Sequence, residues 1–162
     1  MKHQGFTLVE IVCVVAILTI LSVTAVPRFI AIVSDSRASS LENVASAVES
    51  AITMFRTQAM MAGATDKLTI NGETIKVGHD NYPIFSRRNN RLQDQVNALV
   101  SLGSNFRIAS DEDTRDEDGG FVVMFRDLDE DVECYFEYEP PESDDDDDDD
   151  DDAEFEVEDD DC

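Results

Sequence analysis

The sequence predicts an α+β protein in which one long N-terminal helix packs on a small antiparallel β-sheet head. Two observations predict this fold class: residues 6–62 follow helical patterns, first apolar and then amphipathic, and short strand-like segments follow from residue 68. A sheet laid against the amphipathic half of such a helix buries both apolar faces. The length of 162 residues suits one membrane-length segment and one small domain.

The apolar half of the expected helix covers residues 6–28. From Phe6 to Val26 the only charge is Glu10, and a helix of these 21 residues spans roughly 30 Å, the thickness of the hydrocarbon core of a bilayer. An ordinary signal peptide is an alternative, because residues 23–25 have the small-residue pattern of a cleavage site. The single Lys2 before the run, the length of the run and the carboxylate inside it argue against this alternative.

The stretch GFTLVEIVCVVAILTIL, which begins at Gly5, resembles the processing site of type IV pilins and of the related pseudopilins. In that family a prepilin peptidase cuts after the last Gly of a short leader, and the new N-terminal Phe is N-methylated. The resemblance implies that residues 1–5 are the leader, that Gly5 ends it, and that Phe6 becomes the methylated N-terminus. It also makes Glu10 the glutamate at the fifth mature position and Pro27 the family's helix-kinking proline.

Glu10 is costly in an apolar setting unless its charge is compensated. In a filament core, the α-amine of Phe6 from a neighbouring subunit would neutralise the carboxylate, and such a pair sets register more reliably than it adds stability. The alternative is that Glu10 lies near enough to the helix end to reach the membrane interface. Beside Gly5 and Phe6 we favour the paired role.

The amphipathic half of the helix covers residues 29–62, where apolar residues recur at helical spacing between charged ones. The helix is expected to end at Gly63, which is typical of a C-cap. Together the two halves predict a rod of roughly 85 Å. Pro27 has no amide hydrogen to donate, so we expect a kink there.

The globular head is expected over residues 63–141. Its clearest element is a hairpin in which residues 68–70 and 73–77 flank an Asn71-Gly72 turn. The other expected elements are a short helix over 92–100 closed by Gly103 and strands over 106–108, 121–125 and 132–138.

The formal net charge of −25 is concentrated at one end. Residues 1–110 hold 8 acidic and 10 basic residues, a net of +2, whereas residues 111–162 hold 29 acidic and 2 basic residues, a net of −27. Such an acidic segment repels nucleic acid and attracts cations or basic partners, so we expect no nucleic-acid partner. Its simplest role is to keep the chain soluble and extended.

Three cysteines divide into one inside the apolar run, Cys13, and two that flank the most acidic segment, Cys134 and Cys162. Cys13 is expected to act as a small apolar side chain. In an exported domain the other two suggest a disulfide, whereas a cytosolic location would remove that argument. The stretches NYPIF, LQDQVNALV and CYFEYEP are similar to the mannose-sensitive haemagglutinin class of type IV pilins, in which the last residue is the second cysteine.

Residues 142–162 are expected to form an acidic loop closed by Cys162, which the resemblance does not explain. Oxygen-rich segments attract Ca²⁺ or Mg²⁺, but a run of aspartates lacks the fixed geometry of a tight site, so loose cation screening is the expected role. The segment DEDTRDEDGG is not an EF-hand loop, because Arg115 takes a ligand position. The residues of the run are Asp144, Asp145, Asp146, Asp147, Asp148, Asp149, Asp150, Asp151 and Asp152.

Catalytic and cofactor signatures are missing from the sequence. It holds no Gly-rich phosphate loop, no His and Cys metal cluster and no Ser-His-Asp set, and we therefore expect no enzyme and no cofactor. His79 is expected to be a polar loop residue. The basic cluster of Arg87, Arg88 and Arg91 is expected to face solvent or the acidic loop of a neighbouring subunit.

The resemblance implies a structural subunit of a type IV pilus, which polymerises through its N-terminal helix into a surface filament for adhesion, attachment or motility. Its expected partners are copies of itself, the prepilin peptidase and an inner-membrane assembly platform. It would lie in the inner membrane of a Gram-negative bacterium before assembly and in an extracellular filament afterwards. The alternatives are a pseudopilin of a type II secretion system and a secreted acidic cation-binding protein cut after Ala25.

Overall fold

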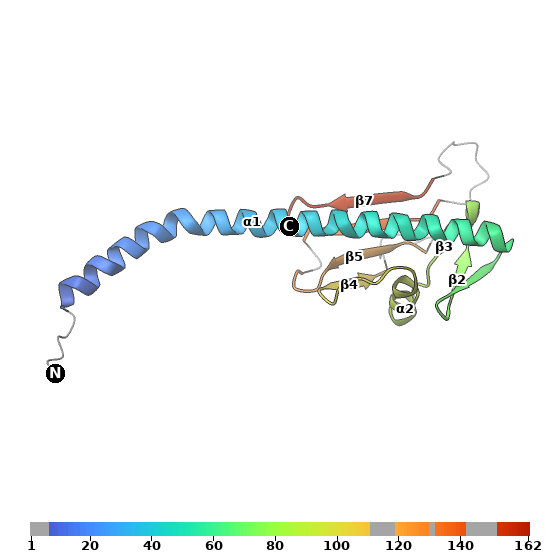
Figure 1. The fold of residues 1–162 in the computed structure, drawn as a ribbon, viewed down its shortest axis with the longest axis horizontal. Coiled ribbons are helices and arrows are strands. Elements are labelled where there is room, and N and C mark those ends of the chain that lie inside the picture. The colour runs from blue at the N-terminus through green and yellow to red at the C-terminus, as the bar shows by residue number, and fades with distance from the viewer. Residues whose placement is uncertain (1–6, 111–118, 130–131, 142–151) are drawn as a thin grey trace.

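The computed structural model describes residues 7–110, 119–129, 132–141 and 152–162. It contains one long helix, α1 (Leu8–Ala62), followed by a head made of two antiparallel sheets and a second helix. Figure 1 shows the head lying along the C-terminal half of α1, while the N-terminal half projects away from it. The predicted α+β fold class, with one long helix on a small antiparallel head, is confirmed.

Both ends of α1 follow from local sequence. At the start, the side-chain oxygen of Thr7 accepts a hydrogen bond from the amide of Glu10 (3.3 Å), which satisfies one of the free N–H groups of the first turn. At the end, Gly63 takes a left-handed conformation (φ 62°), and its amide and that of Ala64 bond to carbonyls of the last turn. This is the C-cap that the sequence predicts at Gly63.

α1 is continuous through Pro27, for its 55 residues are one helix. Figure 1 shows the N-terminal part of α1 inclined to the rest, so the helix bends without being interrupted. A missing proline N–H weakens the helix on one side and permits such a bend. The part that Pro27 plays in it stays a prediction.

The amphipathic half of α1 buries one stripe of side chains against the head. Phe55 and Leu41 are fully buried, and the spacing of the stripe is three or four residues throughout, as a single helix face requires. The stripe consists of Leu41, Val44, Val48, Ile52, Phe55 and Ala59.

The larger sheet has four antiparallel strands in the order β4-β5-β6-β7, each next to its neighbour in sequence. Alternate side chains of the strands point into the core toward α1, where Phe121 meets Phe85 edge-on with ring centroids 5.0 Å apart. The strands are β4 (Phe106–Ala109), β5 (Phe121–Phe125), β6 (Tyr135–Glu139) and β7 (Glu154–Glu158). The buried inward residues are Ile108, Phe121, Val123, Phe125, Phe136 and Tyr138.

The smaller sheet begins with the predicted hairpin, β1 (Lys67–Ile70) and β2 (Glu73–Val77), and adds the short β3 (Pro83–Ile84). Asn71 and Gly72 both have positive φ (50° and 92°), as a two-residue type I′ turn requires. The hairpin prediction is therefore confirmed.

α2 (Asn89–Leu99) ends four positions before Gly103, and a 3-10 turn, η1 (His79–Asn81), precedes it. Val100 is already extended (φ −139°), so Gly103 does not cap the helix. The Gly103 carbonyl instead accepts from Phe106 in the turn that leads into β4. Buried Gln95 anchors α2, because it accepts from the Ser86 amide and donates to the Thr74 carbonyl.

The expectation that residues 142–162 form an acidic loop is wrong for residues 154–158, which form the edge strand β7. The physical reason is the alternation in EFEVE. Phe155 and Val157 face inward and pair in register with Tyr138 and Phe136 of β6, while the glutamates stay on the other face. Residues 142–151 lie outside the described residues.

The disulfide expected between Cys134 and Cys162 is present. Their Cα atoms are 4.9 Å apart, and both residues are buried. The bond closes a loop of sequence separation 28 and holds the C-terminal end of β7 beside the start of β6.

Removing this bond is expected to release β7. The double variant Cys134→Ser/Cys162→Ser should lose about 3–4 kcal/mol of stability by the chain-entropy relation for a loop of this size. Hydrogen exchange of the full chain in detergent should show amide protection lost first over residues 154–158. The variant Cys13→Ser is the matched control, and β7 amides as protected in the double variant as in the wild type would contradict the prediction.

Candidate assembly surfaces

The N-terminal half of α1 is an apolar surface without cover from the head. Large apolar side chains along this half are half or more exposed, among them Leu8 at 79%, Val23 at 75% and Phe29 at 68%. Between residues 8 and 33 the only charged residues are Glu10 and Arg28. Within the described residues, α1 is the one helix long and apolar enough to cross a membrane. An apolar surface of this extent requires a bilayer or other protein to cover it.

The hydroxyl groups of this half of α1 are already satisfied within the helix. Thr19 donates to the Ala16 carbonyl (2.8 Å), and Ser22 donates to the Leu18 carbonyl (2.8 Å). Thr24 makes the same kind of bond. Buried hydroxyls are costly when they lack partners, so this surface can enter an apolar environment without leaving these groups unpaired.

Glu10 lies in the first turn of α1 and is exposed. A carboxylate at a helix N-terminus interacts favourably with the partial positive charge of the free N–H groups. Gly5 and Phe6, the residues that the resemblance joins to Glu10 in function, lie outside the described residues. The structure therefore describes where Glu10 lies but brings no partner to it among residues 7–110, 119–129, 132–141 and 152–162.

The second surface is the acidic C-terminal segment, residues 152–162. Two arginines of α1 bind it through hydrogen bonds, one directly and one through a tyrosine hydroxyl. Near the C-terminal end of the segment, Arg37 donates to the carbonyl of Cys162 (3.3 Å) and to the carboxylate of Asp127 (2.7 Å). The Arg37 guanidinium also stacks over the ring of Phe125 at 5.7 Å.

The N-terminal end of the segment is held through Arg56. Its guanidinium lies 3.8 Å from the centre of the Tyr82 ring and donates to the Tyr82 hydroxyl and to the Asp80 carbonyl. The same hydroxyl donates to the carboxylate of Asp152 (3.2 Å). Residues 152–162 are thus fastened to one helix at both ends.

Tyr138 of β6, which pairs in register with Phe155 of β7, packs in the core beneath the acidic segment. Tyr138 donates to the carbonyl of Pro83 (3.1 Å) and is fully buried. Burial, reinforced by neighbouring Tyr82, raises the pKa of the Tyr138 phenol well above its usual value. The group therefore stays a neutral donor, which is the form that its hydrogen bond requires.

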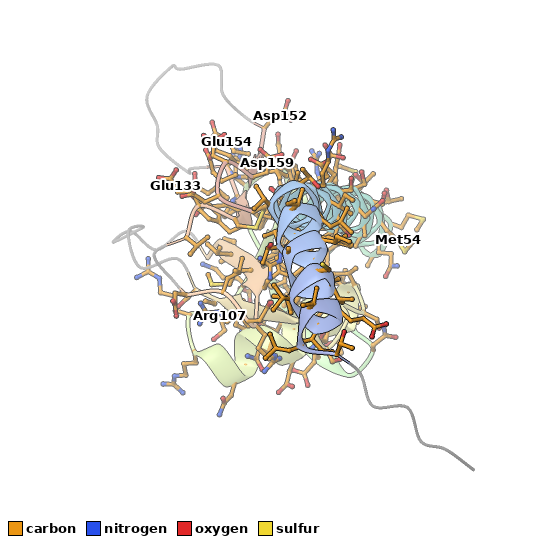
Figure 2. The ribbon with its side chains drawn as sticks, turned by 90° about the vertical axis from the view of Figure 1, so that its left-hand side faces the viewer. Met54, Arg107, Glu133, Asp152, Glu154 and Asp159 are labelled. Atoms are coloured by element: carbon orange, nitrogen blue, oxygen red, sulfur yellow. A yellow bond between two sulfur atoms is a disulfide. The ribbon has the colours of Figure 1, made fainter. Side chains whose placement is uncertain are left out.

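The outer face of β6 and β7 places carboxylates opposite one another. Glu139 pairs in register with Glu154, and Glu137 pairs with Glu156. Figure 2 shows Glu133, Glu154 and Asp159 gathered on the same side of the molecule as Asp152. Like charges directly across a strand pair destabilise a sheet, so this edge depends on the disulfide, the two arginine ties and the inward Phe155.

Repulsion between these carboxylates affects the ionisation of Glu158. Partial loss of hydration and the charges of Glu156 and Asp160 raise its pKa above the usual value. A carboxyl whose pKa is higher in the folded than in the unfolded chain binds its proton more tightly when folded. Its stabilising effect is therefore complete below the unfolded pKa and is lost as pH rises through the folded pKa.

No group of three or more His, Cys, Asp or Glu side chains is arranged to hold a metal ion within the described parts of the chain. Of the polyaspartate run, Asp144–Asp151 lie outside these parts, and Asp152 is bonded to Tyr82. His79 lies in η1. Arg87, Arg88 and Arg91 lie at the start of α2, with all three side chains exposed.

The contacts of Arg37 and Arg56 with the head are not among the sequence predictions, in which both are simply charged residues between the apolar positions of residues 29–62. A signal was present, because each lies four residues from a core position, Leu41 and Ile52 respectively. Side chains four apart share a helix face, so both arginines are directed toward the head.

We expect Glu158→Gln to raise the melting temperature at pH 7, because it removes a charge that the folded state disfavours. The gain should shrink as pH falls, because the raised pKa of wild-type Glu158 lets it take up its own proton at a higher pH than an ordinary glutamate does. Thermal unfolding from pH 4.5 to 8 measures this. Glu42→Gln, an exposed site on α1, is the control, and equal effects of both variants would refute the prediction.

Comparisons with known proteins bear on the N-terminal part of the chain. Residues 1–26 match the family described as "Prokaryotic N-terminal methylation motif". Over 73 residues the chain is 34% identical to "Type IV narrow pilus major component PilA5" of Thermus thermophilus, a match that covers 45% of this chain and 63% of that relative. The chain thus spans less than two thirds of the relative's length, and no solved structure matches it. The chain thus shares the methylation motif with that family, and it is similar to a type IV pilin over part of its length.

Proposed function

We propose that this chain is a structural subunit of a type IV pilus, and that it polymerises through the exposed apolar half of α1. The observation that carries the proposal is the combination of that bare half with a folded head on the other half. The uncovered half needs a bilayer or other protein around it, and in a filament the same half of neighbouring copies would supply that cover. Packing these helices together would form a water-free filament core with the heads outside.

Before assembly, α1 would lie in a membrane. The hydroxyl groups of Thr19, Ser22 and Thr24 are bonded within the helix, which suits a bilayer as well as a protein core. The methylation motif over residues 1–26 supports cleavage after Gly5 by a prepilin peptidase and methylation of Phe6. An inner-membrane platform, a Gram-negative host and a role in adhesion, attachment or motility stay predictions.

The acidic segment has a secondary part in this proposal. Its carboxylates would attract Ca²⁺ or Mg²⁺ as screening counterions rather than bind one ion in a fixed geometry. The pseudopilin alternative shares the same α1 features, and it predicts a secretion defect without long surface fibres.

Mass spectrometry of the mature protein from its native cells, together with imaging of sheared surface fibres, tests the proposed function. We expect a chain that begins at Phe6 and carries one added methyl group, and we expect that chain in the fibres. A chain that begins at Val26 would refute the proposal. A chain that begins at Phe6 but is absent from fibres would favour the pseudopilin alternative.

Glu10 provides a test of the assembly step. Glu10→Gln keeps the size of the side chain but removes its charge, so an arriving subunit's amine would lose its partner in the apolar core. We expect fibre yield to fall roughly tenfold or more, because removing one partner of a buried ion pair costs several kcal/mol. Cleavage at Gly5 should continue. Fibre yield after shearing measures the effect. The control is Glu49→Gln, because Glu49 is an exposed residue on the amphipathic half of α1. Wild-type fibre yield from Glu10→Gln would contradict the paired role.

A further inference from the structure

The charge on the outer face of the four-stranded sheet changes from positive at one edge to negative at the other. Strand register places Arg107 of β4, Met124 of β5, Tyr135 of β6 and Glu158 of β7 in one row across the sheet. Neighbouring strands lie about 4.8 Å apart, so the row runs from a cation to an anion over roughly 14 Å. The head is therefore electrically asymmetric around α1.

The positive edge includes a small polar cavity of about 160 Å³ beside β4. Arg107 and Arg126 line it together with Gln93 and Asn97 of α2. Arg126 is fixed at the rim, because its guanidinium donates to the carbonyls of Ser104 (3.2 Å) and Phe106 (2.9 Å). The two guanidinium groups place positive charge at this edge, which suits a partner that carries carboxylates.

The positive edge extends along α2 to its N-terminal turn, where Arg88 and Arg91 are exposed. The free N–H groups of that turn add partial positive charge. We use the name basic edge for Arg88, Arg91, Arg107 and Arg126.

The opposite edge is uniformly negative. Residues 152–161 carry seven carboxylates and no basic residue, and the outward positions of β7 are occupied by Glu154, Glu156 and Glu158. We use the name acidic edge for residues 152–161. Figure 1 shows β7 and α2 on opposite sides of α1, and Figure 2 shows Arg107 well apart from Glu133, Glu154 and Asp159.

We propose that the acidic edge of one copy docks against the basic edge of a second copy. This inference rests on the proposed function and names the contact by which neighbouring heads recognise one another. Because the two edges are different surfaces, the contact is heterologous, and it leaves a free acidic edge on one copy and a free basic edge on the other. Such a contact repeats without closing unless its rotation completes a ring.

The fold supports a second copy as the occupant. The strands of the larger sheet run along the length of α1 (Figure 1), so two heads docked edge to edge can keep their α1 helices side by side. The same arrangement allows the bare apolar halves of both helices to meet. Opposite charges at the heads would select the orientation of an arriving subunit, and apolar packing of the helices would hold it.

Charge reversal in the full-length chain tests the contact. Arg88→Glu/Arg91→Glu reverses the basic edge, and acidic residues in the first turn of α2 favour the helix, so the head should fold. Glu154→Lys/Glu156→Lys reverses the acidic edge and places lysines opposite Glu139 and Glu137, which favours the sheet. The fourfold variant carries both reversals.

The matched control is Lys67→Glu/Lys76→Glu. It changes the net charge by the same amount as Arg88→Glu/Arg91→Glu. Lys67 and Lys76 face each other in register between β1 and β2 and are exposed, and the hairpin lies at the far end of the head from the projecting part of α1 (Figure 1). The disulfide and the level of the membrane-held subunit report whether each variant folds.

We expect each double reversal to reduce fibre yield roughly tenfold or more, since like charges face each other at a docked edge. The fourfold variant should recover most of the yield, and the control should assemble as the wild type does. Wild-type yield from both double reversals would overturn the contact and leave the proposed function standing. Failure of the fourfold variant to recover, with all variants folded, would also overturn it. A wild-type chain that is absent from fibres would overturn the proposed function and this inference together.

Discussion

The burial of one helix stripe, from Leu41 to Ala59, against the head is the contact on which the rest of the structure depends. It fixes which half of α1 is covered and which half is bare, because a helix presents one apolar stripe to one sheet. The bare half then carries an apolar surface that the described head leaves exposed. Membrane residence and polymerisation are two ways to cover the same surface.

The C-terminal segment shows how a strongly charged strand can be kept on a sheet. Glutamates face glutamates between β6 and β7, which opposes pairing, while Phe155 and Val157 face the core. The disulfide and the ties to Arg37 and Arg56 act at the two ends of the segment. Negative charge concentrated along one edge makes the two edges of the head different. Subunits can then add in one orientation, as an ordered polymer requires.

The helix, its Gly63 cap and the Asn71-Gly72 hairpin could be predicted from the sequence, because each depends on local spacing or on backbone conformation. The strand β7 could not, since the acidic composition of residues 142–161 concealed the alternation of Phe155 and Val157. The ties of Arg37 and Arg56 depend on tertiary contacts with Cys162 and Tyr82, which a helical pattern alone does not reveal. Gly103 does not cap α2 as expected, because the backbone becomes extended at Val100, before Gly103 is reached.

The most direct test of the central claim uses Cys13, a free cysteine on the bare half of α1 that is exposed in the isolated chain. Intact fibres would be treated with a water-soluble maleimide, and the labelled fraction of Cys13 would be compared with that after the fibres are dissociated in detergent. If the bare halves of α1 form the filament core, Cys13 stays unlabelled in intact fibres and reacts after dissociation. Equal labelling of Cys13 in intact and dissociated fibres would show that this half of α1 faces water, and the account would be wrong.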